Sequence, residues 1–484
     1  MDPIRITLRP AETHQVIDSF GASGAWWADP IGEAWSEPAK EHLAELLFSP
    51  TKGIGLSAWR FNIGAGSAWS GDRVWDKWRA PECFKKTADA PYDWSRHAGQ
   101  QWFLRAAVRH GVPTRVAFCC SPPNWLTKNG RGQCDPNVGS TNLKTGNEAA
   151  FARFLGDVLD HFAQQGLAFT DISPLNEPQW EWNEGQEGCR YNNDDMIRLI
   201  RALGAEVKAR GLDCAVDVLD AGEWVFLLDD QDWRGWAHKA APAAYIHANG
   251  TKGWGKYRGY IGDLLGDPEL RAILGNRLSA HSYWTDEGTD RLVNLRRAIR
   301  ANADRVSPGA RLQMTEYCVM QHKRDLGMDM ALRVAKVIHS DLRWAEVSTW
   351  HWWLALSCGD YKDGLLYTDW RENGREEVLT SKTFWALGNW SRYVRPGWHR
   401  VSAEPAGESG LMVTAYASPD GKQLALVAVN EAKEPTRLWL ESDSPLRNLR
   451  LAVTSADQDL AELPQKGDVV EVPARSVVTI LADR

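Results

Sequence analysis

The sequence predicts an α/β protein: a (β/α)8 TIM barrel with an appended all-β sandwich domain. The first observation is a repeated unit, in which a short apolar strand leads into a loop rich in Gly, Pro, Asn or Trp and then into an amphipathic helix. Eight such units are typical of a closed parallel barrel, although a doubly wound open sheet is the alternative. The second observation is that helix patterns stop near Pro396, and only short strands follow. The third is the length of 484 residues, which suits a barrel with one accessory domain.

The eight barrel strands are predicted from apolar runs that have few polar positions, as expected for strands buried on both faces. They are expected at residues 19–23, 56–63, 114–120, 171–175, 214–219, 278–283, 312–317 and 347–352.

Helices are predicted where apolar residues recur at i, i+3, i+4 and i+7, as in Phe151, Phe154, Leu155 and Val158. Glycine follows several of these segments, which suits a helix C-cap. The predicted helices span residues 38–48, 95–110, 147–164, 193–210, 289–303, 328–343 and 382–393.

After the barrel, short strands are expected at residues 411–417, 424–430, 436–440, 449–454 and 477–481. Residues 4–9 alternate apolar and polar side chains, which favours an N-terminal strand that joins this β-sandwich. The predicted division is therefore an N-terminal strand segment at 1–17, a catalytic barrel at 18–394 and a β-sandwich at 395–484.

Composition limits the class of partner. The net charge of −7 argues against nucleic acid, and no apolar run reaches the length of a membrane span. Tryptophan is unusually frequent, with 26 residues against 12 Phe and 11 Tyr. Indole rings stack on the C–H faces of sugars, but they also serve as ordinary core packing. The eight cysteines form no C-x-x-C pair; Cys134 and Cys189 could meet in a disulfide, but reduced thiols are the preferred interpretation.

Two glutamates stand where a barrel places its chemistry, at the carboxyl ends of the strands. Glu177 follows predicted strand four, and Glu316 follows the apolar part of strand seven. These strands face each other across the barrel mouth, so the two side chains can converge on one bond. Hydrolysis of a glycosidic bond requires such a pair of carboxyl groups, about 5–5.5 Å apart in a retaining enzyme. Each glutamate alone would be read as a structural ion pair.

The motifs around these positions resemble glycoside hydrolase family 30 of clan A. The resemblance is carried by Asn176-Glu177-Pro178, by Glu316, and by the segments DSFGAS (18–23), RFNIG (60–64) and SPPNWLTKNG (121–130). It extends over all eight strands, and a β-domain built from both termini also fits that family.

The resemblance implies a retaining double displacement with Glu177 as acid/base and Glu316 as nucleophile. Asn176 would bind the 2-hydroxyl of the reacting sugar, and Arg60 and Tyr283 would orient the nucleophile. His281 and Trp352 would shape the same subsite, although His281 could equally be a satisfied histidine at a strand end. The remaining substrate-binding candidates are Trp26, Trp125, Trp180 and Trp182.

The substrate implied most directly is β-1,6-galactan. The stretch GQEGC (185–189) and the pair Trp26-Trp27 resemble the endo-β-1,6-galactanase subfamily. The alternatives are β-1,6-glucan, β-glucosides including glucosylceramide-like substrates, β-xylan and other β-galactosides. Endo or exo action and the oligomeric state stay open.

Three further expectations concern function and location. No H-E-x-x-H or G-x-S-x-G motif occurs, and neither a metal nor a cofactor is expected. A catalytically inactive, carbohydrate-binding barrel is the rival from a different class. Residues 1–10 lack the apolar stretch of a signal peptide, so the protein is either secreted or periplasmic with its signal removed, or cytoplasmic.

Overall fold

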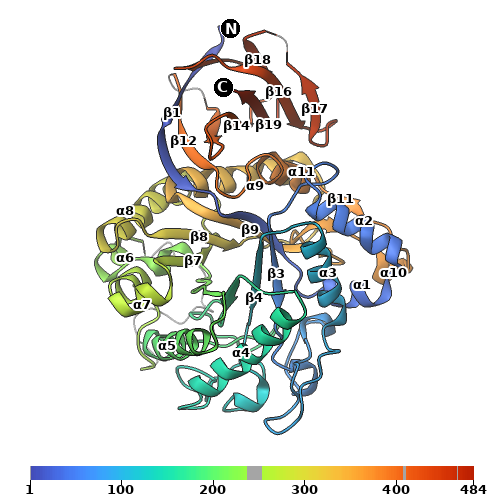
Figure 1. Cartoon of the computed structure of the whole chain (residues 1–484), viewed down its shortest axis with the longest axis vertical. Helices are drawn as coiled ribbons and strands as arrows, with labels where there is room; N and C mark the ends of the chain where they lie inside the picture. The colour runs from blue at the N-terminus through green and yellow to red at the C-terminus, as the bar shows by residue number, and fades with distance from the viewer. Residues whose placement is uncertain (1, 237–252, 407–409, 466) are drawn as a thin grey trace.

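A computed structural model describes residues 2–236, 253–406, 410–465 and 467–484. Figure 1 shows two parts: a barrel surrounded by helices, and a smaller β-domain at one end that contains both chain termini. The predicted fold class is confirmed.

The barrel consists of eight parallel strands in chain order. They are β2 (Ser19–Ser23), β3 (Ala58–Asn62), β4 (Thr114–Phe118), β5 (Asp171–Ser173), β6 (Ala215–Val216), β7 (Arg277–His281), β8 (Arg311–Glu316) and β9 (Val347–Ser357). Each strand pairs in parallel with the next from β2 to β6 and from β7 to β9, and β9 pairs with β2. Every residue of β2, β3, β5 and β7 is buried, which is the two-sided burial that their apolar sequences predict.

The barrel closes between β6 and β7 through a short irregular segment. β6 has only two residues, whereas the sequence predicts a strand at 214–219. Past its end, the amide of Ser279 donates to the carbonyl of Val218, and the amide of His281 donates to the carbonyl of Ala221. Residues 218–221 thus complete the barrel wall without forming a regular strand.

Helices surround the barrel, and most of the long ones are those predicted. They are α1 (Ala28–Ala34), α2 (Glu37–Phe48), α3 (Ala98–Arg109), α4 (Glu148–Gln164), α5 (Asn193–Arg210), α6 (Asp230–Trp236), α7 (Pro268–Ile273), α8 (Arg296–Val306), α9 (Met328–Ser340), α10 (Trp370–Asn373) and α11 (Lys382–Ser391). The helix predicted at 289–303 is instead a π-helical turn at Asp290–Leu295 followed by α8. Two short strands, β10 (Gly364–Tyr367) and β11 (Leu379–Thr380), extend the sheet beside β9.

The β-domain has nine strands in one hydrogen-bonded path. They are β1 (Ile4–Val16), β12 (His399–Pro405), β13 (Met412–Ala417), β14 (Gln423–Asn430), β15 (Thr436–Ser442), β16 (Arg447–Thr454), β17 (Ala461–Pro464), β18 (Val469–Val472) and β19 (Ser476–Asp483). β1 pairs with β12 on one side and β15 on the other, so the N-terminal segment does lie within this sheet. The path folds over on itself, since an apolar cluster including Ile6, Leu426, Leu451 and Val470 draws on strands from both of its ends. The domain limits at 17 and 394 stay a prediction.

The two parts pack through helices α9 and α11, which lie between the barrel and the β-domain in Figure 1. Asn389 of α11 donates to the carbonyl of Ala452 and to Thr479 Oγ1, all buried. His339 of α9 contacts the carbonyl of Val413 at 3.2 Å. The β-domain is therefore joined to the barrel by buried polar contacts as well as by apolar packing.

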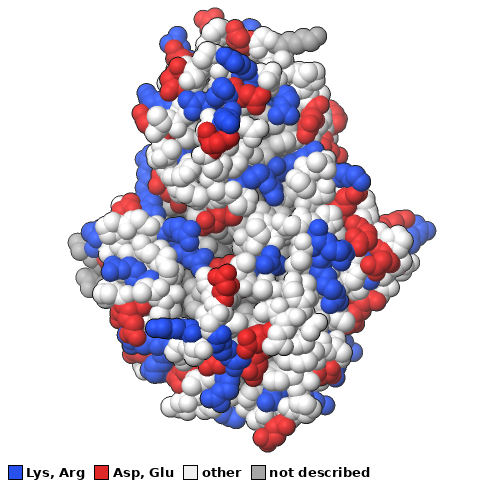
Figure 2. All heavy atoms as spheres, in the orientation of Figure 1, with Lys and Arg blue, Asp and Glu red and all other residues white. Residues whose placement is uncertain are grey.

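Packing accounts for many of the tryptophans. Six rank among the largest side chains that are fully buried: Trp27, Trp59, Trp224, Trp350, Trp352 and Trp390. On the face drawn in Figure 2, acidic and basic side chains are interspersed, in agreement with the mild net charge. Within the described residues, no helix combines the length and the apolar character that a membrane span requires.

Candidate active site

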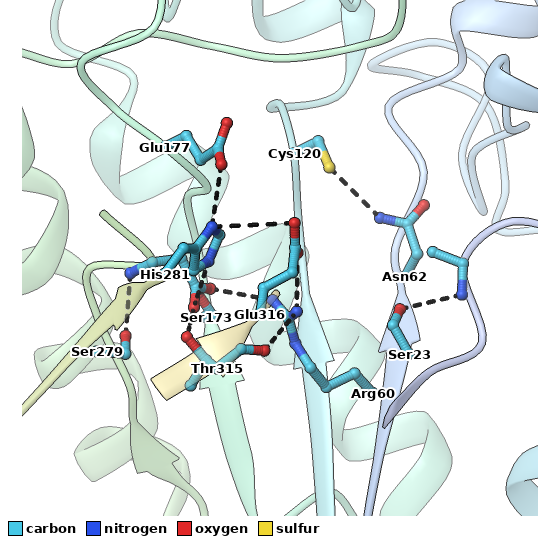
Figure 3. Close-up of polar contacts among 12 residues, drawn as sticks. Ser23, Arg60, Asn62, Cys120, Ser173, Glu177, Ser279, His281, Thr315 and Glu316 are labelled. Carbon is cyan, nitrogen blue, oxygen red and sulfur yellow. Dashed lines mark hydrogen bonds and ion pairs between the residues drawn. The ribbon is translucent and has the colours of Figure 1, made fainter. Parts of the chain in front are cut away.

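Glu177 and Glu316 converge at the mouth of the barrel. Glu316 is the last residue of β8, and Glu177 lies four residues beyond β5. One oxygen of each carboxyl group and one ring nitrogen of His281 lie within 4.8 Å of one another. Figure 3 shows the two glutamates above the strand ends, with His281 between them. Both are nearly inaccessible to solvent, at 8% for Glu177 and 5% for Glu316.

The Glu316 carboxylate is fixed by two donors. Arg60 of β3 donates from Nη1 to Oε2 at 2.9 Å, and the Tyr283 hydroxyl donates to Oε1 at 2.9 Å. The same Arg60 nitrogen also donates to the carbonyl of Thr315, so the guanidinium is hydrogen-bonded to both of the last two residues of β8. Charge-assisted bonds of this kind hold a carboxylate in one orientation. Arg60 and Tyr283 therefore both contact Glu316, and their role in orienting a nucleophile stays a prediction.

Asp220 is a buried member of this network that the sequence analysis did not single out. Its carboxylate accepts from Ser173 Oγ at 2.6 Å and from Arg60 Nη2 at 3.3 Å, and it lies 3.5 Å from His281 Nε2. Burial disfavours its charge, but Arg60 and His281 hold the pKa of Asp220 well below its usual range. The sequence signal for Asp220 is an aspartate directly after the strand predicted at 214–219.

The backbone around Glu177 is held in an uncommon conformation. Glu177 has φ of +44°, a region that costs a non-glycine residue free energy and often marks functional sites. Its amide donates to the carbonyl of Asp220 at 2.8 Å, and its own carbonyl accepts from Trp182 Nε1 at 3.0 Å. These bonds tie the loop after β5 to the loop after β6 and set the direction of the Glu177 side chain.

Glu177 has the electrostatic character of a proton donor. Burial raises its pKa, and the neighbouring carboxylates of Glu316 and Asp220 raise it further, whereas the contact with His281 at 3.0 Å acts against this. The net shift is upward. A raised pKa favours the protonated carboxyl group, and a protonated carboxyl group can give its proton to a leaving oxygen, which is the acid role in glycoside hydrolysis.

His281 is positively charged over the ordinary working range. Burial opposes that charge, but the carboxylates of Glu316, Asp220 and Glu177 outweigh it and raise the pKa of His281 from 6.5 to about 9. Because the folded pKa lies above the unfolded one, the stabilising contribution is complete below about pH 6.5 and is lost as pH rises through about 9.

The direction of this pKa shift predicts how the stability of a His281→Asn variant depends on pH. The loss of unfolding free energy relative to the wild type should be largest below pH 6.5 and should shrink by about pH 10. Urea unfolding at pH 6, 8 and 10 measures it, with the exposed His42→Asn on α2 as control. A difference that stays constant across this range would contradict the assignment of charge to His281.

The remaining polar candidate, Asn176, is 3% exposed. Its Oδ1 is buried and has no hydrogen-bond partner among the described residues. Buried polar atoms are nearly always paired, so an unpaired one beside the catalytic candidates is consistent with a sugar hydroxyl as the missing partner.

The tryptophan candidates fall into different surroundings. Trp180 stacks on Trp284 with ring centroids 5.9 Å apart and planes 7° apart, and it also contacts Trp182. Trp284 follows Tyr283 directly, so this stack lies beside the catalytic pair; the sequence analysis missed Trp284. Trp26 is 2% exposed and donates from Nε1 to Asn62 Oδ1, two residues beyond Arg60.

Two other tryptophans are engaged in packing. Trp352 has no exposed surface, and its Nε1 donates to the carbonyl of Asp363 at 2.6 Å. Trp125 donates from Nε1 to the carbonyl of Lys85 and packs edge-on against Phe154. A direct sugar contact for either residue stays a prediction.

Glu177, His281 and Glu316 also have the spacing of metal ligands. Two features disfavour a cation there: the Arg60 guanidinium already bonds Glu316, and the charged form of His281 cannot coordinate a metal.

We therefore expect hydrolysis to be insensitive to chelation. Incubation with excess EDTA followed by assay should leave kcat unchanged, with the same assay after adding Mg²⁺ or Zn²⁺ as control. Loss of activity that a divalent metal restores would require a metal at this carboxylate cluster or elsewhere.

Comparison with known proteins identifies the family. The sequence matches O-Glycosyl hydrolase family 30 over residues 3–367. The chain belongs to this family. The family predicted from the motifs is thereby confirmed.

Individual members of known function differ in substrate. An endo-β-1,6-galactanase from Hypocrea rufa is 27% identical over 265 residues, which span 48% of this chain and 51% of that protein. The chain thus matches about half the length of that relative. The glucuronoxylanase XynC of Bacillus subtilis is 21% identical over 396 residues, covering 78% of this chain and 76% of its own.

Among solved structures, a conserved exported protein from Bacteroides fragilis superposes with a TM-score of 0.85 at 29% identity. The match covers 98% of this chain and 99% of that one. The whole arrangement of barrel and β-domain is thus shared with a second protein.

Proposed function

We propose that this chain is a retaining glycosidase that hydrolyses β-linked glycans, with Glu177 as acid/base and Glu316 as nucleophile. The observation that carries the proposal is the distance between their carboxyl oxygens, within 4.8 Å at the barrel mouth. Retaining enzymes hold the two groups about 5–5.5 Å apart, whereas inverting enzymes leave about 6.5–9.5 Å for a water molecule. The short separation favours direct attack by a carboxylate.

The reaction follows from the positions of these groups. Glu316, oriented by Arg60 and Tyr283, attacks the anomeric carbon, while the proton of Glu177 passes to the leaving oxygen. The glycosyl–Glu316 ester is then hydrolysed by water that gives a proton to Glu177. The cation of His281 contacts Glu177 and lies 3.9 Å from Glu316, so it stabilises the negative charge that alternates between them.

We propose β-1,6-galactan as the substrate. The support is the GQEGC stretch at 185–189, which lies in the loop after Glu177, together with the similarity to an endo-β-1,6-galactanase. β-1,6-Glucan, β-glucosides and β-xylan are the alternatives, and the glucuronoxylanase relative keeps xylan among them.

A substrate screen tests both the glycosidase activity and the proposed glycan. Purified protein is incubated with β-1,6-galactan, β-1,6-glucan, glucuronoxylan and aryl β-glycosides, and the products are sized by chromatography. We expect galactose oligomers from galactan, and the product sizes distinguish endo from exo action. Release of sugar products from another glycan alone would overturn β-1,6-galactan as the substrate. Binding without release from any of them would favour the inactive carbohydrate-binding barrel.

A further inference from the structure

An exposed tryptophan lies at the edge of the mouth, outside the residues assigned above. Trp75, in the segment between β3 and α3, is 72% exposed. Its amide donates to the carbonyl of Gly185 at 3.0 Å, and its ring packs over Gly185, where an added Cβ would be 3.0 Å from the ring. Gly185 lies eight residues beyond Glu177, so this indole is attached to the loop of the acid/base candidate.

Arg79 connects Trp75 to the rest of the mouth. It ends a 3-10 turn (Lys77–Arg79), and its guanidinium lies 5.3 Å from the Trp75 ring centroid and 4.7 Å from that of Trp78. Within the described residues, the Arg79 guanidinium makes one hydrogen bond, from Nη1 to Gln186 Oε1 at 3.3 Å. A guanidinium has five N–H donors, so most of them are available to a ligand.

Asp363 supplies an unpaired acceptor, and its charge acts on Arg79. It is 4% exposed, and its Oδ1 is buried without a hydrogen-bond partner among the described residues. Burial raises the pKa of Asp363, and the Ser357 hydroxyl and the Arg79 charge act against that shift. Of the charges that act on Arg79, that of Asp363 is the strongest. An unpaired carboxylate oxygen is costly to bury, which a ligand hydroxyl would relieve.

Both groups adjoin the reaction centre. Trp78 contacts Trp26 at 5.6 Å between centroids, and Trp26 bonds Asn62, two residues past Arg60. On the other side, the Asp363 carbonyl accepts from Trp352 Nε1, and the amide of the next residue, Trp353, donates to the carbonyl of Tyr317, which follows Glu316. Chains of contacts thus link Arg79 and Asp363 to the residues around the catalytic carboxylates.

We propose that Arg79 and Asp363, flanked by Trp75 and Trp78, form a subsite for the neutral sugar unit adjacent to the one whose bond is cleaved. The guanidinium donates to one hydroxyl, the Asp363 carboxylate accepts from another, and the indole rings pack on the apolar face of the pyranose. A uronic acid is disfavoured, because its carboxylate would meet the buried carboxyl group of Asp363. This inference rests on the proposed glycosidase function.

The test compares a long and a short substrate. For Arg79→Gln and Asp363→Asn, kcat/KM is measured on a neutral trisaccharide of the glycan identified in the screen and on an aryl β-monoglycoside of the same sugar. The kcat/KM on the trisaccharide divided by that on the monoglycoside should fall about 10-fold or more relative to the wild type. A fall of this size corresponds to the loss of one hydrogen bond to a charged group. Trp75→Ala should lower the same ratio.

Matched controls are available on β15. Trp439→Ala removes a tryptophan that is 45% exposed in the β-domain, and Arg437→Gln removes an exposed guanidinium. Both should leave the ratio unchanged. Equal losses on both substrates in Arg79→Gln and Asp363→Asn, or no loss on either, would overturn the subsite. A loss of activity on the glucuronoxylan of the screen, with activity on the neutral trisaccharide unchanged, would overturn the choice of a neutral sugar. If the wild type cleaves no substrate, the proposed function fails instead.

Discussion

Glu316→Gln should lower kcat by about 10⁴-fold or more, as when other covalent enzymes lose their nucleophile. Glutamine keeps an oxygen for the Tyr283 hydroxyl but cannot form the glycosyl ester. The measurement is steady-state hydrolysis of an aryl β-glycoside, with Glu441→Gln on β15, whose side chain is 51% exposed, as the matched control. Near wild-type activity in Glu316→Gln would remove this residue from the mechanism.

Rescue with azide distinguishes a variant that folds but lacks its nucleophile from a variant that does not fold. In Glu316→Ala, azide fits the space of the missing carboxylate, attacks the anomeric carbon directly and expels the aryl oxide. A single displacement inverts the configuration at the anomeric carbon, so the expected product is the α-glycosyl azide. A β-azide would show that another group still acts as nucleophile.

Glu177→Gln is the second large effect, and its size should depend on the leaving group. With natural oligosaccharides, kcat/KM should fall by about 10³-fold or more, because an alkoxide needs a proton to depart. With a 2,4-dinitrophenyl glycoside the first step needs no acid, so a burst of phenolate should precede slow hydrolysis of the ester. A plot of log kcat/KM against leaving-group pKa should be steep for the variant and shallow for the wild type.

Azide rescue of the acid/base residue should give a product of the opposite anomeric configuration. In Glu177→Ala, azide attacks the glycosyl–Glu316 ester and releases Glu316, so two displacements give the β-glycosyl azide. An α-azide from this variant would exchange the roles of the two glutamates. Equal losses with all leaving groups would contradict the acid/base role.

The sequence predicts regular, strongly patterned parts of this fold well. Helix α5 begins and ends where the 3.6-residue period does, with Asn192 as N-cap and Gly211 as C-cap. Strand β8 is displaced by one residue from its predicted span, and β14 begins one residue before its own and ends as predicted. Three strands of the β-domain, β12, β17 and β18, are missing from the prediction. β17 and β18 have only four residues each, and β12 has Val401 as its one large aliphatic side chain, so none of them differs clearly from a loop in sequence.

The catalytic candidates could be found because their positions depend on strand order alone. Glu177 and Glu316 follow strands four and seven, and a closed barrel places those ends opposite each other. Asp220 and Trp284 could not be found in that way, since their positions depend on how the chain turns after β6 and β7. Arg79 and Asp363 are farther still from prediction, because one lies in the long segment between β3 and α3 and the other in the short connection between β9 and β10, and only tertiary packing relates the two.

The anomer released first is the most direct test of the central claim, that two carboxylates act on one glycosidic bond by double displacement. Proton NMR follows the wild-type enzyme on the β-glycoside that it cleaves fastest, before the product equilibrates in water. The account predicts that the β-anomer accumulates first. First release of the α-anomer would mean a single displacement by water, and would contradict the assignment of Glu316 as nucleophile.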